Sequence, residues 1–150
     1  MGKLYIAYGS NLNLTQMAAR CPSASVYAAG LLNNWELIYR GTQTNSHATI
    51  RRKKGSIVPV LVWEIQPRDE ARLDLYEGYS HYYFKQNVMV DINGKKKKAM
   101  VYIMDKRQLP GRPSRQYIHT IRQGYLDNDF DMEFFDESLE KNDIECRHKM

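Results

Sequence analysis

The feature that most constrains the fold lies near the start of the chain, where a β-strand pattern changes abruptly into a helical one. Residues 4–8 alternate along the chain and are rich in β-forming side chains, which predicts a strand. Residues 9–11, Gly-Ser-Asn, interrupt this pattern, and a helix that Asn11 or Asn13 can cap follows at once. Such an arrangement leaves several backbone N–H groups unpaired near one point, which attracts a carboxylate or phosphate. An ordinary strand–turn–helix connection without a ligand is the alternative interpretation.

The rest of the chain alternates between strand and helix patterns. Further strands are expected over residues 26–32, 35–39, 56–65, 82–91 and 99–104, and a short β-like segment over 48–52, for a total of about six strands. The turn signals are Asn33-Asn34 and Asn93-Gly94, of which the second is the strongest in the chain. Because hairpins dominate, we expect an α+β fold with a mostly antiparallel or mixed sheet.

Capping residues and helical periodicity indicate three more helices. One begins at Pro67 and ends at Gly78, and a second begins after Ser114. Gly124 is expected to loosen the end of the second helix. A third helix covers residues 131–141, after which the polar tail is expected to fray.

Length and composition limit the classes of protein to consider. A chain of 150 residues suits one domain, residues 1–150, with 43% hydrophobic residues to build a core and no apolar run long enough to span a membrane. The two cysteines, Cys21 and Cys146, form neither a disulfide framework nor a zinc pattern, and the four histidines are scattered. We therefore expect a cytoplasmic protein without a metal site.

The net charge of +5 suggests another function, because much of the basic excess lies in residues 51–54 and 95–98. Two such runs are compatible with binding to nucleic acid or to another anionic surface. Each run adjoins a glycine, Gly55 or Gly94, which favours solvated ends of β-hairpins, and lysines at strand edges discourage edge-to-edge pairing. Since the chain lacks an aromatic RNA-binding motif and a helix–turn–helix pattern, nucleic-acid binding is the weaker alternative.

Three segments of the chain resemble motifs of the γ-glutamylcyclotransferase family. Residues 8–12, Tyr-Gly-Ser-Asn-Leu, resemble the opening signature of the family, and the fuller stretch 5–11 is close to the same pattern. Residues 73–79, Leu-Asp-Leu-Tyr-Glu-Gly-Tyr, resemble the segment that holds the catalytic glutamate. Residues 113–117, Pro-Ser-Arg-Gln-Tyr, resemble the segment with a substrate-contacting tyrosine. The ordered set of three is more specific than any one motif, and the C-terminal acidic helix has no counterpart in it.

The resemblance implies that the sheet is curled into a small closed barrel with flanking helices. It also implies an enzyme, an acyltransferase or lyase by reaction type, that cleaves a γ-glutamyl amide by attack of the substrate's own α-amine. The products are 5-oxoproline and a free amine or amino acid, and the reaction needs no metal or cofactor. The matching positions are Glu77 for catalysis and, for binding the small-molecule substrate, Tyr5, Ile6, Ala7, Tyr8, Gly9, Ser10, Asn11 and Tyr117.

Two further points follow from the resemblance. The leaving amine or amino acid is expected to contact the loops at residues 41–47 and 108–113, although its identity is left open. A non-catalytic small-molecule-binding protein on the same scaffold is the alternative to an enzyme, and the oligomeric state is also left open.

Glu77 stands out on physical grounds as well. It occupies the last turn of a predicted helix, where the negative end of the helix dipole destabilises a carboxylate. Nearby tyrosines at positions 76, 79, 82 and 83 are expected to exclude water, and both effects raise the pKa of a carboxyl group toward the range useful for a general acid or base. The alternatives are an exposed glutamate without a role and, for Tyr117, a core tyrosine near a helix start.

Overall fold

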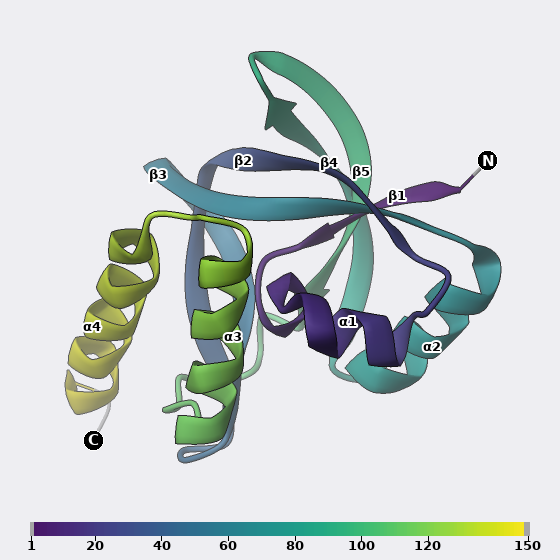
Figure 1. Ribbon diagram of the computed structural model, residues 1–150. Coiled ribbons are helices and arrows are strands. Elements are labelled where there is room, and N and C mark those ends of the chain that lie inside the picture. The colour runs from purple at the N-terminus through teal and green to yellow at the C-terminus, as the bar shows by residue number, and fades with distance from the viewer. Residues whose placement is uncertain (1, 149–150) are drawn as a thin grey trace.

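Within residues 2–148, which the computed structural model describes, a closed β-barrel forms the centre of the fold and four α-helices lie around it (Figure 1). The strands are β1 (Lys3–Ala7), β2 (Ser25–Gly41), β3 (Ser46–Ile65), β4 (Tyr83–Ile92) and β5 (Lys95–Met104). The helices are α1 (Leu14–Arg20), α2 (Pro67–Glu77), α3 (Arg115–Asp127) and α4 (Met132–His148), with a short 3-10 helix, η1 (Ser10–Leu12), between β1 and α1. None of these helices has the length and apolar character needed to cross a membrane.

The strands follow the order β1-β3-β2-β4-β5 around the barrel. Neighbouring strands are antiparallel except β1 and β5, whose parallel pairing of Tyr5 with Met100 closes the ring. The α+β class and the mixed sheet predicted from the hairpin signals are confirmed, and so is the closed barrel that the resemblance implies.

The barrel has five strands rather than about six, because two expected breaks lie inside long strands. The predicted turn at Asn33-Asn34 is wrong: the pairing of β2 with β3 shifts register there, Asn34 has a φ of 67°, and both strands continue. Opposite this bulge, Gly55 has a φ of 85° and its N–H donates to Asn34 Oδ1 at 3.0 Å. Residues that tolerate positive φ serve in bulges as well as in turns, so the sequence pattern does not distinguish the two.

Only one of the two basic runs lies at the end of a hairpin, as both were predicted to do. Residues 51–54 lie within β3 beside the bulge, whereas residues 95–98 directly follow the Asn93-Gly94 turn, as predicted. Asn93 and Gly94 have φ angles of 52° and 85°, as a two-residue hairpin turn requires. Both basic runs are exposed to solvent.

Helix α2 begins and ends where the sequence predicts. Pro67 lies in its first turn, Gln66 and Asp69 form a capping box, and Gly78 ends the helix in the left-handed conformation with a φ of 62°. These local signals together place Glu77 at the last position of the helix.

Gly124 does not loosen the end of α3, because the helix continues to Asp127. A Cβ atom added at Gly124 would lie 2.7 Å from Leu12 Cβ and 2.8 Å from the carbonyl carbon of Leu12. The glycine therefore allows α3 to approach the backbone of η1 closely.

Helix α4 is longer than predicted, since it continues past residue 141 to His148. Asn142 and Cys146 lie on its buried face, at 5% and 7% exposure. The polar residues that suggested a frayed tail therefore belong to a packed helix. Among the residues described, both cysteines are free and buried.

Candidate active site

A cavity of about 600 Å³ lies between the end of β1, the end of α2 and the segments that follow β2 and β5. Most of the residues predicted for the site border this cavity: Tyr5, Ile6, Tyr8, Gly9, Ser10, Asn11, Glu77 and Tyr117. Ala7 is the exception, because its side chain is buried in the core and is not among the lining residues. The structure therefore brings all but one of the predicted residues to the same cavity.

The loops expected to contact the leaving group also reach this cavity. Gly41 borders it from the end of β2, Thr42 and Asn45 from the connection to β3, and His47 from the start of β3. Gln108 borders it from the segment between β5 and α3. The prediction that both loops line the cavity is confirmed.

Glu77 is the only carboxylate among the described residues that border the cavity. One turn earlier, Asp74 anchors α2 by accepting hydrogen bonds from Tyr102 Oη at 2.6 Å and from Lys85 Nζ at 3.1 Å. Desolvation raises the pKa of Glu77 to about 7, although the positive charge of Arg20 opposes the rise. Because the cavity bounds one side of the residue, Glu77 keeps intermediate exposure while the protein encloses its other sides.

Three of the four tyrosines expected around Glu77 lie at the cavity, but Tyr76 and Tyr82 are 45% and 59% exposed, so only Tyr83 is buried as a side chain that excludes water would be. Tyr76, Tyr82 and Tyr83 border the cavity, and the Tyr83 hydroxyl donates to the carbonyl oxygen of Ala48 at 2.7 Å. Tyr79 instead lies with its ring 4.3 Å from Lys85 Nζ.

The bend after β1 presents backbone donors at the cavity. The carbonyl oxygens of Gly9 and Ser10 accept hydrogen bonds from Leu12 and Asn13, which form the turn of η1. Within residues 2–148, by contrast, the N–H groups of Gly9, Ser10 and Asn11 have no acceptor outside regular secondary structure. Such unpaired donors are suited to an anionic group.

The sequence predicts that an α-helix follows the bend directly. In the structure the 3-10 helix η1 lies between the bend and this α-helix. Helix α1 begins only at Leu14, and Asn13, rather than Asn11, caps it by accepting a hydrogen bond from the N–H of Gln16 at 2.9 Å. The side chain of Asn11 is used elsewhere, because its Nδ2 donates to the Tyr5 hydroxyl at 2.9 Å.

Tyr117 packs against the barrel and also reaches the cavity. Its hydroxyl oxygen accepts a hydrogen bond from the N–H of Ala48 at 3.0 Å, and its ring meets the edge of His47 at a centroid distance of 4.9 Å. The hydroxyl lies beside Gly9, since a Cβ atom added at Gly9 would lie 3.5 Å from it, an ordinary contact distance. Burial lowers the pKa of His47, so this cavity residue is neutral near pH 7.

Arg20 is a residue of the site that sequence reasoning missed. Its Nη1 donates to Ser10 Oγ at 3.1 Å and to Asn11 Oδ1 at 2.5 Å, and its guanidinium lies 3.3 Å from the centre of the Tyr76 ring. It thus connects the bend after β1 to the helix that carries Glu77. The sequence offers one weak signal, a basic residue in the last turn of the first helix, which is also the ordinary place for a cation.

We expect the substitution Arg20→Gln to raise the pKa of Glu77 above its present value of about 7, because the positive charge of Arg20 lowers it. Titration of the glutamate side-chain carbons by NMR measures this pKa directly. The substitution Arg122→Gln, which removes a surface arginine paired with Asp136, is the matched control and should leave the titration unchanged. An identical Glu77 midpoint in both variants would contradict the coupling.

Within the described residues, no group of three or more His, Cys, Asp or Glu side chains is arranged to hold a metal ion. The expectation of a site without a metal remains a prediction.

The fold and the cavity define a barrel protein whose enclosed carboxylate, with a pKa near neutrality, is suited to proton transfer. Residues 5–123 match the family model described as "Gamma-glutamyl cyclotransferase, AIG2-like", and the chain belongs to this family.

Individual relatives agree with this family. The chain is 30% identical to a human and 32% identical to a bovine γ-glutamylcyclotransferase, in alignments that cover 93% of this chain and 80% of each relative. A solved structure of a γ-glutamyl cyclotransferase is 29% identical and superposes with a TM-score of 0.83 over 93% of this chain and 87% of that one. The Bacillus subtilis protein YkqA, at 17% identity, shares the fold with a TM-score of 0.79 over 95% of this chain and 54% of its own.

Proposed function

We propose that the chain converts a γ-glutamyl amide into 5-oxoproline and a free amine or amino acid, and that Glu77 transfers the proton. One observation carries this proposal: a carboxyl group with a pKa of about 7 borders the same cavity as the amide groups of Gly9 and Ser10. Membership of the γ-glutamyl cyclotransferase family supports the reaction type.

The amide-lined bend is the proposed binding site for the α-carboxylate of the substrate. The N–H groups of Gly9, Ser10 and Asn11, which have no acceptor outside regular secondary structure within residues 2–148, would donate to its oxygens. Tyr5, Ile6 and Tyr8 border the same space, and the Tyr117 hydroxyl lies beside Gly9. Ala7 contributes to the core below the bend rather than to the substrate surface.

The proposed reaction removes two protons from the α-nitrogen, and Glu77 carries one of them. Ionised Glu77 accepts a proton from the α-ammonium group, and the resulting amine nitrogen attacks the γ-carbonyl carbon of the same molecule. The bond between that carbon and the leaving nitrogen then breaks, while protonated Glu77 returns the proton to the leaving nitrogen. The new ring nitrogen loses its second proton, which the released amine takes up, so that the products are the neutral lactam and an ammonium group. Since nucleophile and electrophile belong to one substrate, the cavity acts mainly by holding the folded conformer. A carboxyl group with a pKa near 7 is effective in both proton transfers.

The proposal is tested by incubating the protein with a series of γ-glutamyl dipeptides and measuring 5-oxoproline by chromatography. Formation of 5-oxoproline together with an equal amount of the released amino acid supports it. A protein that binds these dipeptides but leaves them intact would instead be a non-catalytic binding protein on the same scaffold.

We expect kcat/KM to rise with pH through a midpoint near 7. The base that accepts the first proton must be ionised in the free enzyme, and the pKa of Glu77 is about 7, so activity is low below this pH and reaches a plateau above it. Initial rates of 5-oxoproline formation across roughly pH 5 to pH 9 measure this rise of kcat/KM with pH. A rate that is already maximal near the ordinary glutamate pKa of 4.5 would contradict a role for Glu77 with a raised pKa.

The remaining sequence-based expectations accompany this proposal. We propose residues 1–150 as one domain, and a cytoplasmic location stays a prediction. The two exposed basic runs leave nucleic-acid binding as a separate hypothesis, which salt-dependent binding to single-stranded or duplex probes would support.

A further inference from the structure

The connection between β2 and β3 and the segment between β5 and α3 form one continuous part of the cavity lining. We call this the leaving-group wall and define it by its cavity residues Gly41, Thr42, Asn45 and Gln108. Backbone hydrogen bonds join the two segments: from Gly41 to Leu109 at 2.9 Å, from Arg112 to Gln43 at 2.7 Å, and from Ser46 to Arg112 at 3.2 Å. The two segments are therefore bonded to each other along this part of the cavity lining.

Helix α4 is attached to this unit at Gly111. The carbonyl oxygen of Gly111 accepts hydrogen bonds from Ser46 Oγ at 2.7 Å and from Asn142 Nδ2 at 2.9 Å, and both donors are buried. Gly111 is packed so closely against Thr42 that an added Cβ atom would lie 2.0 Å from the Thr42 carbonyl oxygen. Helix α4 is therefore bonded to the residue that packs against Thr42 of the wall.

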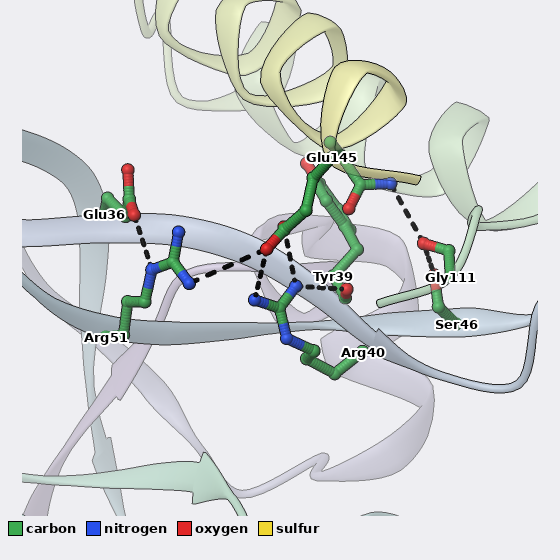
Figure 2. Close-up of polar contacts among 8 residues, drawn as sticks. Glu36, Tyr39, Arg40, Ser46, Arg51, Gly111 and Glu145 are labelled. Carbon is green, nitrogen blue, oxygen red and sulfur yellow. Dashed lines mark hydrogen bonds and ion pairs between the residues drawn. The ribbon is translucent and has the colours of Figure 1, made fainter. Parts of the chain in front are cut away.

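A second attachment runs through Arg40, which borders the cavity next to Gly41. The two terminal nitrogens of Arg40 donate to the two carboxylate oxygens of Glu145 on α4, at 3.1 and 3.2 Å, and Arg40 also bonds the Tyr39 carbonyl oxygen (Figure 2). The Arg40 side chain is only 11% exposed, so its charge depends on Glu145 for compensation.

Figure 2 shows that Glu145 reaches down from α4 toward Arg40 and Arg51 on the neighbouring strands. Arg51 lies 3.9 Å from Glu145 and is itself paired with Glu36 at 2.5 Å. Glu145 does not border the cavity, and of its two arginine partners only Arg40 does.

The geometry points to α4 as a determinant of leaving-group recognition, with Glu145 as a positioning residue that acts through Arg40. Helix α4 lies after the residues that the family model matches, 5–123. The inference rests on the proposed function, since it concerns the half of the substrate that departs. Glu145 bonds Arg40, and Asn142 on the same helix bonds Gly111 next to the wall.

The test compares Glu145→Gln with Glu137→Gln, which removes a carboxylate from the same helix but breaks only an exposed pair with Lys141. Two substrates are used: a γ-glutamyl dipeptide with a large leaving amino acid, and γ-glutamyl methylamide, whose leaving group is too small to reach the wall. For Glu145→Gln we expect KM for the dipeptide to rise about tenfold, with kcat nearly unchanged. A tenfold change corresponds to the loss of one charged hydrogen bond between the displaced Arg40 and the leaving group. The methylamide kinetics and the pH midpoint should not change, and Glu137→Gln should behave as the wild type.

A purely structural role would give a different result. A lowered Tm with the same proportional loss on both substrates, or a dipeptide KM equal to that of Glu137→Gln, would overturn the inference. Glu145→Asp restores the negative charge and should recover part of the dipeptide KM. If the wild type forms no 5-oxoproline from any substrate, the proposed function itself has failed, whereas an active wild type with an unaffected Glu145→Gln variant refutes only the role of α4.

Discussion

Replacement of Glu77 by glutamine is expected to lower the rate of 5-oxoproline formation by about 10²–10⁴-fold while the fold is retained. Glutamine keeps the shape of the side chain at the end of α2 but cannot accept the proton from the α-ammonium group or return one to the leaving nitrogen. The geometry of the cavity is otherwise preserved, so substrate binding measured by calorimetry should change little. Turnover near the wild-type rate would rule out the proposed role.

The same substitution should make the protein more stable at neutral and alkaline pH. The pKa of Glu77 is about 7 in the folded state against an ordinary value of 4.5, so between these pH values the folded chain holds a proton that the unfolded chain has released. The free energy of unfolding therefore falls as pH rises through this window and stays lower above it. Glutamine removes this penalty, which we expect to amount to roughly 1–3 kcal/mol in urea unfolding above about pH 7.

Glu70, on the same helix, provides a control of opposite sign. Desolvation raises the pKa of Glu70, but hydrogen bonds from Lys85 and Lys3 outweigh this effect and lower it. The ionised form of Glu70 therefore stabilises the fold above its unfolded pKa, and this contribution is lost as pH falls through its folded pKa. Glu70→Gln should be less stable than the wild type near pH 7 and should keep its activity, because Glu70 does not border the cavity. Inactivity with increased stability in Glu77→Gln alone would link both effects to the active-site carboxyl.

Valine at Gly124 is expected to destabilise the protein by about 1–3 kcal/mol and to lower activity at the same time. The new side chain would collide with Leu12 and with the backbone nitrogen of Asn13, which lies 2.8 Å from the position of an added Cβ. Helix α3 cannot retreat freely, because Asn128 Nδ2 donates to the Leu12 carbonyl oxygen at 2.8 Å. A shift of η1 would displace the amide-lined bend, while a shift of α3 would displace Tyr117.

Urea unfolding and 5-oxoproline formation measure the two effects of Gly124→Val. Gln123→Val places the same side chain on the exposed face one position earlier and removes only a hydrogen bond to Asp127, so it should retain both stability and activity. Equal behaviour of the two variants would show that the close approach of α3 to η1 is not required.

The parts of the site that depend on neighbouring residues were predictable from the sequence. The alternation of residues 4–8 and the Gly-Ser-Asn break predict a strand that ends in unpaired amides, and the structure has this bend beside the cavity. Pro67 and Gly78 mark the two ends of α2 and so place Glu77 at its last residue. Each of these features rests on backbone preferences that act within a few residues.

Other parts were not predictable, because they depend on segments that are distant in the sequence. The Asn33-Asn34 pair reads as a turn, yet the partner strand and Gly55 make it a bulge. The polar end of α4 reads as a frayed tail, yet Asn142 is ordered by the carbonyl oxygen of Gly111. Local propensity is outweighed in each case by pairing or burial against another part of the chain.

The sequence by itself therefore determined the strand and helix types, the position of Glu77 at a helix end and the bend of Gly9 and Ser10. Only the tertiary structure decided that the barrel closes, that Arg20 joins the bend to α2, and that α4 pairs with Arg40 through Glu145. The physical reason is the range of the interactions. Capping and turn preferences are set by adjacent residues. The desolvation that raises the pKa of Glu77 and the ion pair that holds Arg40 require surfaces that meet only in the folded chain.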